Sequence, residues 1–164
     1  MLGCSAVAST PPVAVPKPGA IETYRDWTIG CDNRARCEAI ALMPEGSDWP
    51  DEMVVLGVAR DAGANADTQI WVDHGRIGPR AMIGFWVDGR KIASAPVTGD
   101  STKLQGPQAS ALAIAMARGR AMEIRAGDRV IARPLLIVAA AVLRYMHGRQ
   151  VRAGTITALI AAGP

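Results

Sequence analysis

The sequence predicts an α+β fold of mostly antiparallel β-sheet, as a sandwich or a partly open barrel, with two helices in the C-terminal half. Strand-like segments dominate up to residue 96, and the short links between them favour antiparallel pairing. After Gly106-Pro107 the pattern becomes helical in two places. The 164 residues, 49% of them hydrophobic and 20% charged, suffice to bury one core, which excludes a disordered chain.

Six segments carry strand signals, with apolar residues that alternate or are β-branched. They are residues 24–30, 37–42, 53–59, 68–72, 80–87 and 91–96. Asp88-Gly89, between the last two, is the strongest short hairpin signal because both residues tolerate a positive φ. The polar segment 60–67 predicts an exposed loop.

A short helix is expected at residues 108–118, which contain no β-branched run and are followed by Gly119. Residues 121–124 and 130–132 then flank a turn at 126–128 and predict another hairpin.

A second helix is expected to start at Pro134 and to run to Met146 or His147, with Gly148 ending it. Its residues are so apolar that we expect it in the core, and it is too short to span a membrane. Residues 155–161 predict a last strand.

The first residues resemble the end of a bacterial lipoprotein signal. Leu2 and Gly3 precede Cys4, although the basic start and the long apolar stretch of such signals are missing. Residues 5–20 contain four prolines and small residues, which is typical of an extended tether. We therefore predict a start and tether at residues 1–20, a globular domain at 21–164, and a lipid on Cys4 that anchors the protein to a membrane. The alternative is a chance cysteine near a start site.

The other two cysteines, Cys31 and Cys37, flank a turn rich in Asp, Asn and Arg between two strand-like segments. Five intervening residues allow them to face each other across the neck of a hairpin, which predicts a disulfide. A metal site would need about four ligands, and the only histidines, His74 and His147, lie far apart, so we predict no metal. The spacing also differs from the Cys-x-x-Cys redox motif. A disulfide and a lipidated start together predict the bacterial periplasm.

Charge is unevenly distributed along the chain. Residues 20–67 hold ten acidic and four basic residues, whereas residues 118–164 hold eight basic and two acidic ones. A basic face could bind nucleic acid, an anionic membrane surface or an acidic glycan, but no nucleic-acid motif is present. We favour the alternative that the two regions lie side by side and that their opposite charges cancel. We therefore predict no nucleic-acid partner.

No catalytic residues are predicted. The sequence has no Gly-x-Ser-x-Gly elbow, and Asp73 and His74 would point to opposite faces of a strand. His74 in Asp-His-Gly is expected to be an exposed turn residue, and His147 to be a favourable cation at a helix C-terminus. The sequence also indicates no cofactor.

The best candidate binding surface is the helix-to-strand turn around residues 144–152. Its candidate residues are Arg144, Tyr145, His147, Arg149, Gln150 and Arg152, joined by Trp49 from a separate loop. The equally weighted alternative is that the arginines cap a helix and form salt bridges to the acidic N-terminal strands. Trp27 and Trp86 lie in strand patterns and are expected in the core.

Two stretches carry a family resemblance. Residues 24–33 with the following Cys37, and residues 139–159, resemble the opening and closing signatures of the bacterial domain-of-unknown-function family 1176, which is related to the invasion-associated locus B proteins. The resemblance covers about residues 20–163. It implies a secreted or periplasmic protein, and it does not point to any enzymatic activity.

The sequence thus predicts a periplasmic lipoprotein whose domain is a non-catalytic binding or envelope-associated module, with a possible protein partner in the envelope. The alternative is an inhibitor of lysozyme or a protease that inserts an exposed loop, either residues 60–67 or the turn at Trp49. An enzyme centred on His147 and Arg149 is the least favoured hypothesis.

Overall fold

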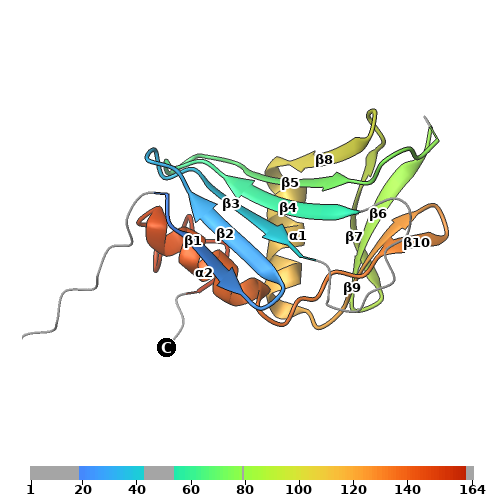
Figure 1. Ribbon diagram of the computed structural model, residues 1–164. Helices are drawn as coiled ribbons and strands as arrows, with labels where there is room; N and C mark the ends of the chain where they lie inside the picture. Colours follow the sequence, from blue (N-terminus) through green and yellow to red (C-terminus); the bar gives the residue numbers. More distant parts are fainter. Residues whose placement is uncertain (1–18, 43–53, 79, 162–164) are drawn as a thin grey trace, which may run out of the picture.

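The computed structural model describes residues 19–42, 54–78 and 80–161, which form two antiparallel sheets and two helices (Figure 1). Every strand pairing in both sheets is antiparallel, and the sheets do not close into a barrel. The predicted α+β class, with helices in the C-terminal half, is therefore confirmed.

The larger sheet has six strands in the order β1-β2-β3-β4-β5-β8. Its strands are β1 (Ile21–Tyr24), β2 (Trp27–Cys31), β3 (Cys37–Ala41), β4 (Val55–Arg60), β5 (Thr68–Asp73) and β8 (Ser101–Gln105). The strand expected at 24–30 is divided because Arg25, with a φ of +50°, makes a tight turn between β1 and β2. Strand β8 was not predicted from the sequence, because its outward positions lie on the sheet surface and are polar.

The smaller sheet has four strands in the order β10-β9-β6-β7. Its strands are β6 (Met82–Val87), β7 (Arg90–Pro96), β9 (Met122–Ala126) and β10 (Arg129–Ala132). Asp88 and Gly89 have φ values of +47° and +77°, as a two-residue hairpin turn with positive φ at both positions requires. Both hairpins that the sequence predicts in this region are confirmed.

Helix α1 (Gly106–Arg118) ends before Gly119, as predicted. Helix α2 (Ala139–Arg149) begins later than expected and continues through Gly148. Pro134 does not start it, because Leu135 is held in an extended bridge to Ala121. Residues 155–161, expected as a strand, form turns instead.

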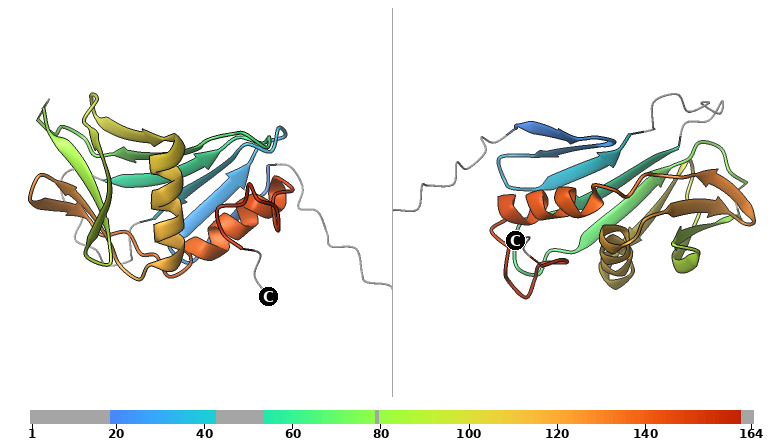
Figure 2. Two further views of the ribbon diagram at one scale, coloured as in Figure 1. Left: turned by 180° about the vertical axis from the view of Figure 1, so that it is seen from behind. Right: turned by 90° about the horizontal axis from the view of Figure 1, so that it is seen from below.

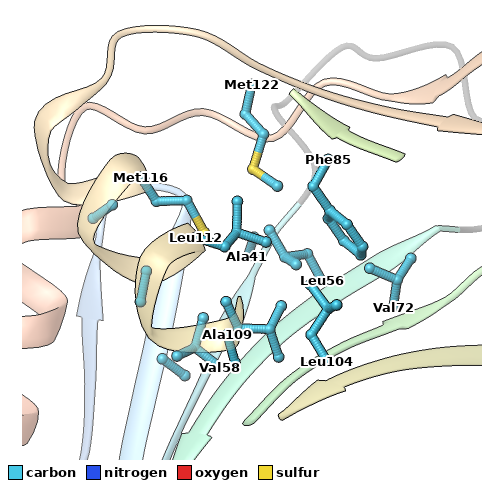
Figure 3. Packing of buried hydrophobic residues seen from close by; sticks show 14 of the residues in the cluster. Ala41, Leu56, Val58, Val72, Phe85, Leu104, Ala109, Leu112, Met116 and Met122 are labelled. Atoms are coloured by element: carbon cyan, nitrogen blue, oxygen red, sulfur yellow. The ribbon is translucent and has the colours of Figure 1, made fainter. Parts of the chain in front are cut away.

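Both helices cover the same face of the larger sheet (Figure 2). Along β2, β3, β5 and β8 buried residues alternate with accessible ones, so one face of each strand enters the core and the other faces outward. Figure 3 shows the core, in which Leu112 and Met116 of α1 pack with Leu56, Phe85 and Leu104 from both sheets. Within residues 19–42, 54–78 and 80–161, no helix covers the outward face of the larger sheet.

Candidate functional site

The predicted disulfide is confirmed. Cys31 and Cys37 are register partners at the end of the β2–β3 hairpin, with their Cα atoms 4.0 Å apart. Both residues are buried in the core, so the bond closes the hairpin from inside. A disulfide here holds the turn at residues 32–36 against the main body of the sheet.

The structure separates the residues of the predicted C-terminal binding surface. Arg144 is exposed, and Tyr145 and Arg149 are half-buried. The Tyr145 ring meets Tyr24 edge to face, with centroids 6.1 Å apart. His147, Gln150 and Arg152 are 1%, 8% and 3% exposed. Cys4 and Trp49 lie outside the described residues.

Gln150 and Arg152 bind backbone carbonyls rather than a ligand. Gln150 Nε2 donates to the carbonyls of Ala35 and Arg60 at 3.0 and 2.7 Å. Arg152 donates from Nη1 to Ala64 and from Nη2 to Asp61, at 3.4 and 3.3 Å. These bonds fasten the segment after α2 to the β2–β3 turn and to the β4–β5 loop.

The salt bridges expected between the basic C-terminal region and the acidic N-terminal strands are not found among the described residues. Arg36 pairs with Asp61 at 2.7 Å, and both lie in the N-terminal half. Arg125 and Arg133 both pair with Glu123, which lies in the C-terminal half. Arg152 uses backbone carbonyls as acceptors instead, and the expected salt bridges stay a prediction for the other arginines of the C-terminal region.

Two buried arginines, Arg60 and Arg152, lie close to the buried His147 at the end of α2. Arg60 is 6% exposed and donates from Nε to the Ala66 carbonyl at 3.2 Å. Burial lowers the pKa of Arg60, and the charge of Arg152 lowers it further. Burial, followed by the charges of Arg60 and Arg152, lowers the pKa of His147 to about 4. His147 is therefore neutral at pH 7, and its expected role as a capping cation is wrong.

His74 also differs from its prediction as an exposed turn residue, because it is 1% exposed. Its Nδ1 lies 2.9 Å from the Gly75 carbonyl and its Nε2 lies 3.0 Å from Thr102 Oγ1. Because a carbonyl only accepts, Nδ1 donates to Gly75, and Nε2 shares the second hydrogen bond with the Thr102 hydroxyl. His74 joins the end of β5 to β8 and is not available for chemistry.

The outward face of the larger sheet carries a hollow of about 310 Å³ that crosses β3, β5 and β8. It is lined by Arg36, Glu38, Gln69, Ile70, Trp71, Asp73, Ser101, Lys103 and Gln105. The polar members face each other in register, because Gln69 pairs with Gln105 and Asp73 with Ser101. Trp71 pairs with Lys103 between these two rows. The volume is at the low end of the roughly 300–1,000 Å³ typical of ligand sites.

Trp71 lies across the neighbouring strand, over Gly57 of β4. A Cβ on Gly57 would stand 2.1 to 2.5 Å from three indole atoms, Cε2, Cζ2 and Nε1. Cε2 is bonded to both Cζ2 and Nε1, so a Cβ that is close to all three atoms would stand above the plane of the ring and not at its edge. The indole of Trp71 therefore lies flat on Gly57. Covering a glycine in this way stabilises a sheet. Because Trp71 remains half-buried rather than buried, it also presents an aromatic surface to the hollow.

The hollow is polar and its charges are balanced. Arg36 and Lys103 are basic, whereas Glu38 and Asp73 are acidic. Arg36 is already neutralised by Asp61 outside the hollow. Within the described residues, no side-chain hydrogen bond or ion pair occupies Gln69, Lys103 or Gln105, so their polar groups are available to a ligand.

A second hollow, of about 380 Å³, lies between α1 and the β6–β7 hairpin. It is wider and mainly apolar, with Asp88, Arg90 and Arg118 as its polar members. The Asp88 carboxylate already accepts the backbone N–H groups of Arg120 and Ala121, at 3.0 Å each, so it is occupied. The hollow around Trp71 is therefore the better candidate site.

The described residues contain no group of three or more His, Cys, Asp or Glu side chains arranged to hold a metal ion. Within the same ranges, no helix has the length and apolarity needed to cross a bilayer.

The chain belongs to the family described as "Protein of unknown function (DUF1176)", whose model matches residues 21–164. The fold is similar to the crystal structure of invasion associated protein B from Bartonella henselae, with a TM-score of 0.59 and 14% sequence identity. This similarity covers 80% of the present chain and 99% of the Bartonella chain. No curated protein matches the sequence.

Sequence reasoning did not find the hollow. Residues 69–73 and 101–105 both alternate, with Gln69, Trp71 and Asp73 on one face of the first segment. This alternation was the available signal, since an outward Trp between polar residues is unusual on a solvated strand. Which two strands bring these residues together is decided by the β5–β8 pairing, which skips two intervening strands.

Proposed function

We propose that this protein is a non-catalytic binding module of the bacterial cell envelope and that it binds its ligand on the outward face of the larger sheet. The observation that carries the proposal is the hollow around Trp71. It combines a flat aromatic surface with the polar side chains of Gln69, Lys103 and Gln105, which have no partner within the described residues. These groups sit on rigid strands, which hold a binding site more firmly than loops do.

The envelope location is supported by two features of the chain. The buried Cys31–Cys37 disulfide suits an oxidising compartment such as the periplasm. Cys4 after Leu2 and Gly3, followed by a proline-rich segment, suits a lipid anchor and a tether. Intact mass of protein taken from membrane and soluble fractions tests the location. An acylated Cys4 is expected, and a soluble chain with three free thiols would contradict it.

Site-specific photo-crosslinking in the native bacterium tests the binding face. A photoreactive residue replaces Lys103 or Gln105, which are exposed at the hollow. The matched control replaces Arg129, which is exposed at the start of β10 on the other sheet. Adducts are expected from the two hollow positions and not from the control. Equal labelling at all three positions, or none at the hollow, would overturn the proposal.

A second candidate function is inhibition of a lysozyme or protease by the β4–β5 loop. Residues 61–65 are exposed, yet the carbonyls of Asp61 and Ala64 are held by Arg152. A loop that is held in place from beneath loses little conformational entropy on binding, which favours insertion into an active site. A panel of purified lysozymes and proteases tests this function, and no inhibition at micromolar protein would exclude it.

A further inference from the structure

We propose that the hollow around Trp71 binds a neutral oligosaccharide, with a sugar ring stacked on the exposed face of the indole. The inference rests on the proposed binding function and adds the chemical class of the ligand.

The site is open because the strand between its two sides carries only small outward residues there. Gly57 and Ala59 are the outward residues of β4 at the hollow, and both are small. Because these residues rise little above the strand, the indole of Trp71 lies across β4, between Glu38 on β3 and the side chains of β8. Neighbouring strands lie about 4.8 Å apart, so the three intervals from β3 to β8 span about 14 Å. The result is an open trough on the sheet rather than a deep pocket for one side chain.

Trp71 supplies an aromatic platform. The indole of Trp71 lies against the backbone of β4 because Gly57 has no Cβ, so its orientation is set by the sheet. A pyranose ring has one face made of C–H groups, which stacks on an aromatic ring and removes apolar surface from water. A platform that is already flat and fixed binds such a face without ordering a mobile side chain.

Hydrogen-bonding groups surround the platform. Sugar hydroxyls both donate and accept, and the amides of Gln69 and Gln105 do the same. Asp73 supplies acceptors and Ser101 supplies a hydroxyl on the opposite side of Trp71. The platform thus has polar groups on both sides, as a sugar ring with hydroxyls around its rim requires.

Charge favours a neutral glycan over a polyanion. With Arg36 paired to Asp61, the remaining charged groups at the hollow are Lys103, Glu38 and Asp73. A nucleic acid could also stack a base on Trp71, but its phosphates would meet two carboxylates and one ammonium group. Phosphate binding requires clustered basic residues, which the described part of this face does not offer.

The experiment is a titration of the full chain, labelled with nitrogen-15, with three soluble probes. The probes are N-acetylglucosamine oligomers, cello-oligosaccharides and heparin fragments. Calorimetry measures affinity, and the NMR signal of the Trp71 indole N–H reports the site. At least one neutral probe is expected to bind and to shift this indole more than those of Trp27 and Trp86. A response to heparin alone would overturn the assignment of a neutral ligand.

Two variants and one control locate the binding. Trp71→Ala is expected to weaken binding at least tenfold. Gly57→Ala keeps every lining side chain but pushes the indole off the strand, so it is expected to cause a similar loss. The matched control is Trp86→Ala, which removes another half-buried Trp, stacked by Arg125 at 4.6 Å on the smaller sheet. This control should stay within twofold of the wild-type affinity. If Trp71→Ala fails to fold, the indole shift in the wild-type chain still decides the question.

The possible failures are distinguishable. If no glycan perturbs Trp71 but a photoreactive residue at position 103 still captures envelope material, the glycan inference is wrong and the binding function stands. If neither the glycan titration nor the photo-crosslinking gives a signal, both the glycan inference and the binding function are wrong. If a glycan binds with full affinity to Trp71→Ala, the glycan lies elsewhere and the site is wrong.

Discussion

Acidification should destabilise this protein through one histidine. His147 is 1% exposed, and its pKa is lowered from 6.5 to about 4, first by burial and then by the charges of Arg60 and Arg152. Between pH 6.5 and 4 the unfolded chain binds a proton at this histidine that the folded chain does not. Stability is therefore fully present above pH 6.5 and is lost as the pH falls toward 4. Each unit of difference in pKa corresponds to about 1.4 kcal/mol, so the full loss is on the order of 3 kcal/mol.

The assay is urea unfolding at intervals from pH 7.5 to pH 4, for the wild type and for His147→Gln. Glutamine retains an acceptor that can take the place of Nε2, which accepts the Leu159 N–H at 3.4 Å. Carboxylates such as Glu123, whose pKa is lowered first by its hydrogen bond to Arg125, titrate in both proteins. Their contribution cancels in the difference between wild type and variant. That difference should change by on the order of 3 kcal/mol over the pH range, in favour of the variant at low pH.

The reasoning is refuted if the free-energy difference between the two proteins does not change with pH. A direct check is an NMR titration of the His147 ring protons in the folded protein. A folded-state pKa at or above 6 would mean that water or a counter-ion reaches the ring.

Three further predictions concern stability, each measured by urea unfolding. Gln150→Leu keeps the side-chain volume but leaves the carbonyls of Ala35 and Arg60 without their donor. It is expected to lower the free energy of unfolding by about 2–4 kcal/mol. A loss below about 0.5 kcal/mol would show that water replaces the amide. Reducing Cys31–Cys37 opens a loop with a sequence separation of 6 and should cost about 2 kcal/mol by the loop-entropy model; an unchanged midpoint in reductant would contradict this. Trp27→Phe removes the Nε1 donor that bonds the Leu135 carbonyl at 2.8 Å and leaves a void in the core. The expected loss of unfolding free energy is about 3 kcal/mol. A near-neutral result would mean that the core closes around the void.

The C-terminal segment illustrates why a site is harder to predict than a fold. Arg, Tyr and Gln gathered near a helix end have the composition of a binding surface. Gln150 and Arg152 are instead buried, because the carbonyls of the β2–β3 turn and the β4–β5 loop lie within reach of their side chains. Those carbonyls belong to segments about 90 to 115 residues away in sequence. The binding role predicted for this segment remains a prediction for its accessible members, led by Arg144.

The sequence by itself determined the α+β class, the Asp88-Gly89 hairpin, the Cys31–Cys37 pairing and the extent of α1. Each of these depends on residues within a few positions of one another, where turn geometry, capping and alternation act directly. Tertiary structure alone decided that His74 and His147 are buried, that α2 starts after the bridge at Leu135, and that Trp71 forms a platform. These features depend on which distant strands become neighbours. Strand order is set by the packing of the whole core. A local sequence pattern does not change with the strand that becomes its neighbour, so it cannot predict that order.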